Sequence, residues 1–293
     1  MNPRTRNLLE VNAAVLLWGG TALFAKLIPL PVPAIILGRS IMAVLALGVF
    51  LRLTGQRCRF HGRRDTAGVL LIGALLGIHW LTYFHAIRIS TVAVGIIALH
   101  TYPILTILLE PLFFRERLHR VDCLCGVLVL VGIVILVPEF RLGSDITLGV
   151  LWGVLSAVFF ALRNILTRAY VRRYSSSVLM FYQALVIAVL MVPYGMARPP
   201  VVDTRSVGLL ALLGVLFTAL PQTLFTSGHA HLKAKTVSII ATMLPVYGAT
   251  TAFLLLGEVP TMRTLAGGAI VVGTVVVETF RSVGAQPGAD RDS

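Results

Sequence analysis

The sequence predicts an all-α integral membrane protein with ten transmembrane helices, arranged as two inverted repeats of five helices. Three observations lead to this fold class. The 293 residues are 57% hydrophobic and only 13% charged, whereas a soluble domain carries roughly 25% charged residues. The apolar residues form runs long enough to cross a bilayer. The Lys and Arg residues gather in alternate connections between these runs, which is the pattern that orients membrane proteins.

The apolar runs define the predicted helices. A helix needs about 20 mostly apolar residues to cross a bilayer, and its backbone groups must bond internally because lipid offers no partners. The first run ends without a small-residue cleavage site, so we interpret it as a retained helix rather than a signal peptide. The predicted spans are residues 8–28, 34–52, 67–87, 91–113, 121–138, 147–168, 177–194, 207–228, 236–256 and 264–280.

The loop charges predict the orientation. Both ends and alternate connections hold 17 Lys and Arg residues, whereas the other connections hold 5. Basic loops stay in the cytoplasm, so we expect a multi-pass protein of the inner membrane with both termini cytoplasmic. The net charge of +13 is thereby explained without a nucleic-acid partner. Cys58, Cys123 and Cys125 lie in or beside cytoplasmic segments, where thiols stay reduced.

The two halves of the chain repeat each other at a spacing of about 142 residues. We therefore divide the chain into a first five-helix repeat (1–138), a second repeat (147–280) and a disordered cytoplasmic tail (281–293). Since five is odd, the second copy crosses the membrane in the opposite direction, and inverted repeats are a known basis for alternating access. The matches are Pro103, Glu116 and Gly126 with Pro245, Glu258 and Gly268; Trp18 and Lys26 with Phe160 and Arg168; and Gly73 and 82–84 with Gly214 and 223–225.

These motifs resemble the drug/metabolite transporter superfamily, in its EamA branch of ten-span carriers. The resemblance implies a central cavity lined mainly by spans one, three, four, six, eight and nine. It also implies a function like that of bacterial exporters of amino acids, including aromatic amino acids, and of toxic cations. Arg115 stands where a glycine usually precedes the glutamate. The matching stretches are 16–19, 102–103, 115–118 and 126, then 244–245, 257–258 and 267–268.

Ionisable residues inside a span are costly and often functional. Arg163 lies six residues inside the sixth span and offers a forked donor to a substrate carboxylate; the alternative is that it reaches the cytoplasmic interface or pairs with Glu110. Asn164 is a second substrate contact, or else a bond to a neighbouring helix. Glu110 is a candidate for proton coupling, against an ion pair at the interface. Lys26 and Arg39 are interpreted as interface anchors.

Aromatic and polar residues supply the other cavity candidates. His79 and Tyr83 share one helical face, with Trp80 beside them, and form either a cavity wall or a packed helix interface. Proline removes an N–H and frees a carbonyl, so a helix break at a proline contributes to gating or is only a static kink. The further cavity candidates are Trp18, Tyr102, Gln222 and Tyr247, and the gating candidates are Pro103, Pro221 and Pro245.

Glu116 and Glu258 are expected to end helices and hold loops. Gly73 and Gly77, like Gly149 and Gly153, permit close helix contact, which we expect within the chain rather than between copies. The protein is therefore expected to work as a monomer, with a dimer as the alternative.

We predict a secondary transporter that exports small metabolites, most of all amino acids, by alternating access. Its partners are the small-molecule substrate and membrane lipid. No phosphate loop and no metal-ligand spacing occurs, so we expect no cofactor, no metal and no enzymatic activity. The alternatives are export of quaternary cations or drugs, nucleotide sugars or organic phosphates, then a channel, then a membrane-embedded enzyme.

Overall fold

The computed structural model describes residues 3–56, 60, 62–114, 120–136, 144–170, 173–199, 202–228, 240–241 and 243–284. Cys58, Glu116 and the last nine residues of the predicted tail lie outside this part. Its helices are α1 (Pro3–Thr21), α2 (Phe24–Leu27), α3 (Val32–Leu53), α4 (Arg63–Ile89), α5 (Val92–Leu99), α6 (Tyr102–Phe114), α7 (Arg120–Leu136), α8 (Asp145–Arg168), α9 (Ser176–Ala197), α10 (Thr204–Gly214), the π-helix η1 (Val215–Ala219), α11 (Leu220–Gly228), α13 (Leu244–Leu256) and α14 (Met262–Gly284).

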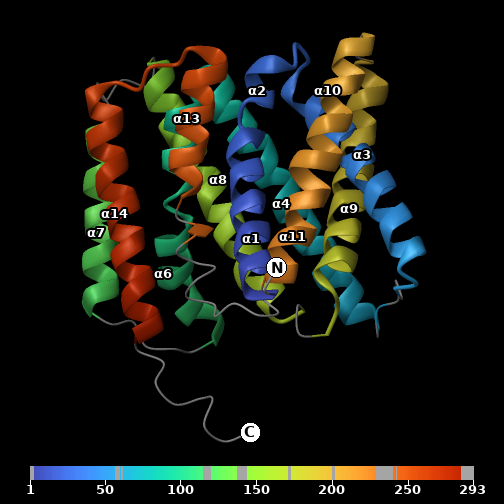
Figure 1. Ribbon diagram of the computed structural model, residues 1–293, viewed down its shortest axis with the longest axis horizontal. Helices are drawn as coiled ribbons and strands as arrows, with labels where there is room; N and C mark the ends of the chain where they lie inside the picture. The colour runs from blue at the N-terminus through green and yellow to red at the C-terminus, as the bar shows by residue number, and fades with distance from the viewer. Residues whose placement is uncertain are drawn as a thin grey trace, which may run out of the picture.

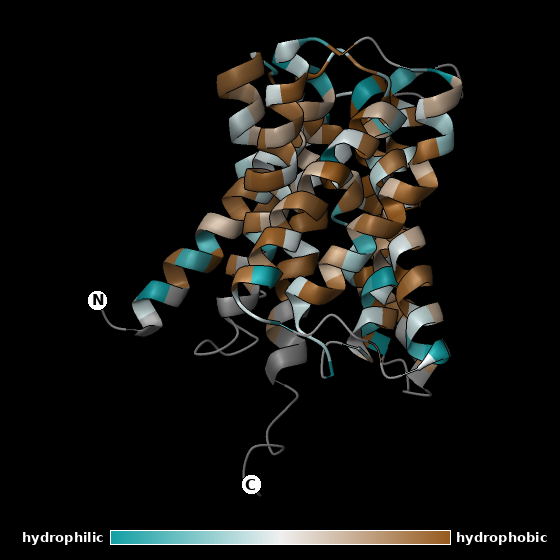
Figure 2. Cartoon of the chain, turned by 90° about the vertical axis from the view of Figure 1, so that its right-hand side faces the viewer, coloured by the Kyte–Doolittle hydropathy of each residue, from teal (hydrophilic) through white to brown (hydrophobic). Residues whose placement is uncertain are grey.

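The helices stand side by side in one bundle (Figure 1). α4 packs chiefly against α8, α3 against α9, α7 against α14, and α1 against both α11 and α13. α7 and α14 form one edge of the bundle in Figure 1, and α3 and α9 form the opposite edge. The first residues of α1 and the last residues of α14 lie at the same end, drawn at the bottom in Figures 1 and 2.

Six helical segments are long and apolar enough to cross a membrane by length and composition: Leu8–Leu27, Val32–Leu53, Arg63–Ile89, Asp145–Thr167, Ser176–Ala197 and Thr204–Gln222. Three shorter apolar helices accompany them, namely Val92–Thr106, Leu244–Leu256 and Met262–Val277. Large apolar side chains such as Leu45, Leu130 and Leu254 point outward and are 59–70% exposed. Hydrophobic residues fill the middle of the bundle in Figure 2, as expected for helices that face lipid.

Among the described residues, the first and the fourth predicted spans are broken where the sequence analysis expects continuous helices. The first breaks between α1 and α2, where Leu23 N–H and Ala25 N–H bond to carbonyls three residues earlier. The fourth breaks at His100 and Thr101, between α5 and α6. Pro103 explains this second break, because it is the second residue of α6 and brings no N–H to the carbonyl of Leu99. The eighth span continues through the π-helix η1, and Pro221 follows directly in α11.

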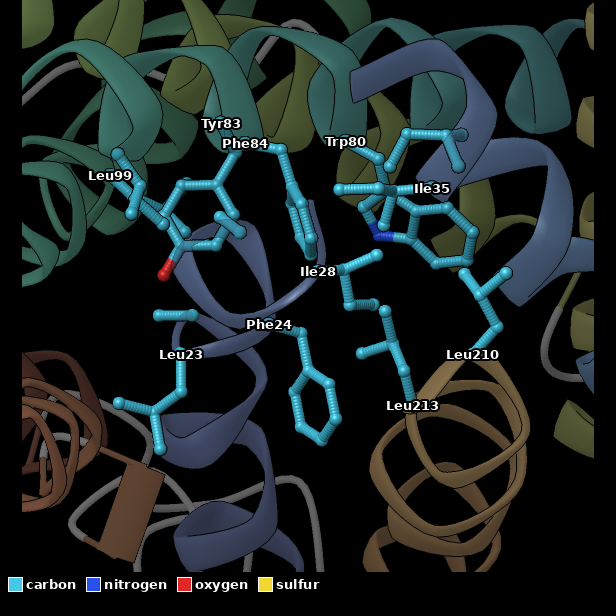
Figure 3. Close-up of a cluster of buried hydrophobic side chains, with 14 of the residues drawn as sticks. Leu23, Phe24, Ile28, Ile35, Trp80, Tyr83, Phe84, Leu99, Leu210 and Leu213 are labelled. Carbon is cyan, nitrogen blue, oxygen red and sulfur yellow. The ribbon is translucent and has the colours of Figure 1, made fainter. Parts of the chain in front are cut away.

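The largest apolar cluster surrounds the break between α1 and α2 (Figure 3). Phe24 and Ile28 lie there against Phe84 of α4 and Leu213 of α10, and these four side chains are at most 3% exposed. Leu76, Trp80, Tyr83 and Leu99 belong both to this cluster and to the wall of the central cavity described below. The cluster is therefore continuous with the cavity wall.

Two sets of hydrogen bonds, one from Lys26 and one from Arg88, hold the end of the bundle near α2 together. Lys26 donates from Nζ to the carbonyls of Ser90 at 2.7 Å and Arg88 at 3.3 Å. Arg88 in turn donates from Nη2 to the carbonyls of Leu30 at 2.7 Å and Ile28 at 3.0 Å. A cation at the end of a helix satisfies carbonyls that lack helical partners. Lys26 thus bonds to the C-terminal end of α4.

The glycine pairs face other helices of the same chain. A Cβ on Gly73 or Gly77 would meet Val186 or Ile187 of α9 at 2.8 or 3.2 Å. In α8, Gly149 faces Ser90, and a Cβ on Gly153 would meet the Cβ of Ala98 at 2.5 Å. Small residues therefore set the close approach of α8 to the α4–α5 region.

Candidate functional site

A central cavity of about 370 Å³ lies between the two halves of the chain. This volume is in the usual range for small-molecule sites. Its wall consists of Val15, Trp18, Thr21, Arg39, Leu76, His79, Trp80, Tyr83, Leu99, Tyr102, Phe160, Arg163, Asn164, Met180, Phe217, Thr218, Gln222, Phe225, Ala241 and Leu244.

Eight of the nine cavity candidates chosen from the sequence lie in this wall: Trp18, His79, Trp80, Tyr83, Tyr102, Arg163, Asn164 and Gln222. Tyr247 does not. It packs beside a cluster that includes Val11 and Ile240, and its hydroxyl donates to Asn12 Oδ1 at 3.3 Å. The candidate coupling residue Glu110 is in α6, and its side chain lies outside the described part of the chain.

Arg163 is held by two amide oxygens. Its Nε donates to Gln183 Oε1 at 2.9 Å and its Nη1 to Asn164 Oδ1 at 3.0 Å. Gln183 is 1% exposed and is itself held, since its Nε2 donates to the Leu179 carbonyl at 3.0 Å. Through this contact the Asn164 side chain binds Arg163, its neighbour in α8, and not a residue of another helix. An amide oxygen orients a guanidinium without cancelling its charge, so Arg163 stays positive at the cavity.

His79 joins α4 to α8 through Ser156. The Ser156 hydroxyl donates to the His79 carbonyl at 3.0 Å, and His79 Nδ1 lies 2.7 Å from the same Oγ. Because that hydroxyl has a single proton, its oxygen accepts from Nδ1, which therefore carries the ring proton. His79 is 5% exposed. It is both a wall residue and part of a packed helix interface, so the two readings that the sequence left open describe the same residue.

Seven other residues of the wall are aromatic. Phe160 lies at the centre, with ring centroids 4.5 Å from His79 and 4.8 Å from Tyr102. On the other side of the cavity Trp18 lies 4.8 Å from Phe225. Such rings offer a broad apolar surface to the carbon skeleton of a solute.

Arg39 is the charged residue of the cavity wall that the sequence analysis missed. Its interpretation as an interface anchor is wrong, because it is 3% exposed and lies in the cavity wall. Its guanidinium carbon is 3.9 Å from the ring centre of Trp80, and its Nη2 donates to Thr218 Oγ1 at 2.7 Å. The signal in the sequence is the distance of Arg39 from the end of its helix. α3 begins at Val32, two turns earlier, so Arg39 lies too deep in the helix to anchor its end.

The prolines leave backbone carbonyls without helical donors. Pro103 and Pro245 are each the second residue of their helices, α6 and α13, so the carbonyls of Leu99 and Ala241 meet no N–H four residues later. Both of these residues line the cavity. Pro221 likewise leaves the Phe217 carbonyl to accept from Thr21 Oγ1 at 3.2 Å. Their part in gating stays a prediction.

Much of the wall is paired at the repeat spacing. Fourteen of its residues form seven pairs that are 142 positions apart: Trp18 with Phe160, Thr21 with Arg163, Leu76 with Thr218, Trp80 with Gln222, Tyr83 with Phe225, Leu99 with Ala241, and Tyr102 with Leu244. Residues of both halves of the chain thus face the same space.

Comparison with known proteins gives a consistent result. The sequence profile of the EamA-like transporter family matches residues 8–137 and 147–279. The pseudopaline exporter CntI of Pseudomonas aeruginosa strain UCBPP-PA14 is 29% identical over 244 residues, which are 83% of this chain and 84% of that protein. An S-adenosylmethionine uptake transporter of Rickettsia conorii is 22% identical over 212 residues, covering 71% of this chain and 69% of that protein.

A solved crystal structure shares the fold, with a TM-score of 0.66 and 19% sequence identity over 97% of this chain and 99% of the other. Since the profile covers most of the chain and the similar proteins are transporters, the protein belongs to the EamA-like transporter family, and it is a multi-pass membrane protein that transports small molecules.

Proposed function

We propose that this protein is a secondary transporter that exports small metabolites, amino acids in particular, across the inner membrane by alternating access. Two inverted repeats of five spans each, residues 1–138 and 147–280, rock around the central cavity. The two ranges matched by the family profile support this division. The common end of α1 and α14 in Figure 1 supports an even number of spans and termini on one side, which we assign to the cytoplasm.

The observation that carries the proposal is the cavity wall. Residues of both halves, among them seven pairs that are 142 positions apart, face one space, which fits alternating access around a midplane site. Within that space Arg163 is fixed by Gln183 and Asn164, and it is the group to receive the carboxylate of an amino acid.

The cavity argues against cationic substrates. None of its described wall residues is acidic, whereas a quaternary cation needs a carboxylate or an uncommitted aromatic cage. Direction of transport is a proposal as well, because one relative is named an exporter and another an uptake transporter.

Reconstitution tests the proposal. Purified protein in liposomes loaded with an unlabelled amino acid should accumulate the same labelled amino acid by saturable counterflow, which a channel does not show. Arg163→Ala should strongly reduce flux of carboxylate substrates without loss of folding. Arg205→Ala removes an exposed arginine at the start of α10 and should leave flux unchanged. Unaltered uptake of every carboxylate by the Arg163 variant would refute the role of Arg163.

The topology has a separate test. With the native cysteines replaced, single cysteines placed near Pro3 and Gly284 should both react with an impermeant thiol reagent only from the cytoplasmic side. Labelling of the two ends from opposite sides would contradict the inverted ten-span arrangement.

A further inference from the structure

The charge of the cavity wall is unbalanced. Arg39 and Arg163 both lie in the wall, and none of its described residues is Asp or Glu. Among the described residues neither arginine has an ion pair. A buried charge is strongly disfavoured unless it is paired, so a solute that neutralises this wall carries two negative charges.

Arg39 is held in place and still has N–H donors that the described residues do not use. Thr218 donates its hydroxyl proton to the Leu213 carbonyl at 2.8 Å, so its Oγ1 accepts the bond from Arg39 Nη2. Trp80 covers one face of the guanidinium. Nε and Nη1 of Arg39 are buried and have no acceptor among the described residues. A guanidinium fixed in this way is prepared to bind an oxyanion.

Arg163 is the second anion position. Of the five N–H groups of a guanidinium, two are bonded to the amide oxygens of Gln183 and Asn164. The other N–H groups take no part in these two hydrogen bonds, and the Arg163 side chain is only partly buried at the cavity. Each arginine is thus fixed by its own partners, so the wall offers two anion positions rather than one clamp.

Neither arginine follows the repeat. The position 142 residues after Arg39 is Phe181, and the position 142 residues before Arg163 is Thr21. A residue needed for the shared helix architecture would be expected in both halves. Each charge instead occurs in one half only, opposite an uncharged residue at the corresponding position of the other half, which favours a role in recognising an asymmetrically placed solute.

We propose that the cavity selects small dicarboxylates, acidic amino acids among them, with one carboxylate on Arg39 and the other on Arg163. The aromatic rings between these positions contact the carbon body. This assignment rests on the transport site of the proposed function and names its substrate class. A single phosphate group would use one position and leave the other guanidinium unpaired.

Ligand binding to purified protein in detergent tests the assignment without requiring transport. The probes are glutarate, its half-amide and its diamide, which differ in charge but hardly in shape. A bound ligand raises the melting temperature by an amount that grows with the logarithm of 1 + L/Kd, where L is the ligand concentration, so probes at equal concentration are ranked by affinity. Glutarate should bind at least tenfold more tightly than the half-amide, since one charge-assisted contact is worth about that factor. Equal binding of glutarate and the half-amide, or tighter binding of glycerol 3-phosphate, overturns the dicarboxylate assignment.

Variants of Arg39 test whether this residue binds the second carboxylate. Arg39→Gln should reduce the preference for glutarate over the half-amide to near unity while binding of the half-amide changes little. Arg39→Lys should restore part of the preference, and Arg205→Gln should retain all of it. If Arg39→Gln weakens both ligands equally, Arg39 is not the second anion position. If Arg39→Gln does not fold, the wild-type series decides alone. Tight glutarate binding without saturable flux in liposomes would count against the proposed transport function and not against this assignment.

Discussion

Glu258 Oε2 accepts a hydrogen bond from the backbone N–H of Val92 at 2.8 Å, across 166 positions of sequence. Val92 is the first residue of α5, where a helix has unsatisfied N–H groups and a partial positive charge. Gly257, just before the glutamate, has φ +68° and ends α13. A turn of the second half thus caps a helix of the first, which is how Glu258 holds a loop as the sequence analysis expects. Glu116, its repeat partner, lies outside the described residues.

Replacing Glu258 with alanine removes this cap. We expect Glu258→Ala to lower the free energy of unfolding by about 1–2 kcal/mol, the range of lost helix caps. Glu258→Gln keeps an acceptor and should lose less. Thermal unfolding in detergent measures both, and an unchanged melting temperature for Glu258→Ala would show that the cap is dispensable.

Gln183 is a neutral hydrogen-bond partner of Arg163. Gln183→Glu places a carboxylate where the amide oxygen now accepts from Arg163 Nε, so it should neutralise the guanidinium and weaken carboxylate binding at least tenfold. Gln183→Met, similar in volume, removes the bond but keeps the charge and should be milder. The affinity for glutarate measures the difference. Equal losses in the two variants would indicate that Gln183 acts only through packing.

Ser156 links the two helices that flank the cavity. Ser156→Ala deletes both its donation to the His79 carbonyl and its acceptance from Nδ1, leaving a buried ring N–H with a poorer partner. We expect a loss of about 1–3 kcal/mol in stability, the cost of a buried unsatisfied group. Ser40→Ala is a suitable control, because that buried hydroxyl bonds only within its own helix, to the Ile36 carbonyl. A control variant as unstable as Ser156→Ala would contradict this account.

Gly153 sets the approach of α8 to α5. Gly153→Leu cannot be accommodated beside Ala98, and we expect it to destabilise the protein by more than about 2 kcal/mol through helix displacement.

Gly208 provides the contrast, because a Cβ there meets nothing within 4 Å and the residue is in α10. Gly208→Ala should stabilise the protein by about 0.5–1 kcal/mol, since alanine has the higher helix propensity. The two melting temperatures should move in opposite directions. A shift of the same sign in both would argue against close packing at Gly153.

The positions of the helices follow from hydrophobicity, and so could be predicted. Where the structure describes the predicted spans, they fall on helices, in places with a break, because lipid leaves the backbone few alternatives. The breaks were harder to predict. Pro103 signals the one after α5, whereas no proline stands at Ala22 or Leu23, where α1 gives way to α2. The sequence therefore offers no comparable local signal for that interruption.

The cavity residues are predictable where a polar or aromatic side chain lies deep inside a predicted span. His79 and Tyr83 carry such a pattern on one face of a helix, with Trp80 beside them. The environment of Arg39 depends instead on Thr218 of η1, which is 179 positions away, and distance along the chain hides it. Tyr247 shows the opposite error: a polar aromatic residue within a predicted span bonds to Asn12 rather than facing the cavity.

The two carbonyls that Pro103 and Pro245 leave without a helical donor belong to the main chain, so replacing the side chain of Leu99 or Ala241 leaves these acceptors in place. Relatives whose wall side chains have diverged to suit other solutes would keep this pair of acceptors as long as both prolines remain. We therefore expect such relatives to differ in the charge of the solutes that they bind. They should still share a preference for solutes that carry an N–H or O–H donor.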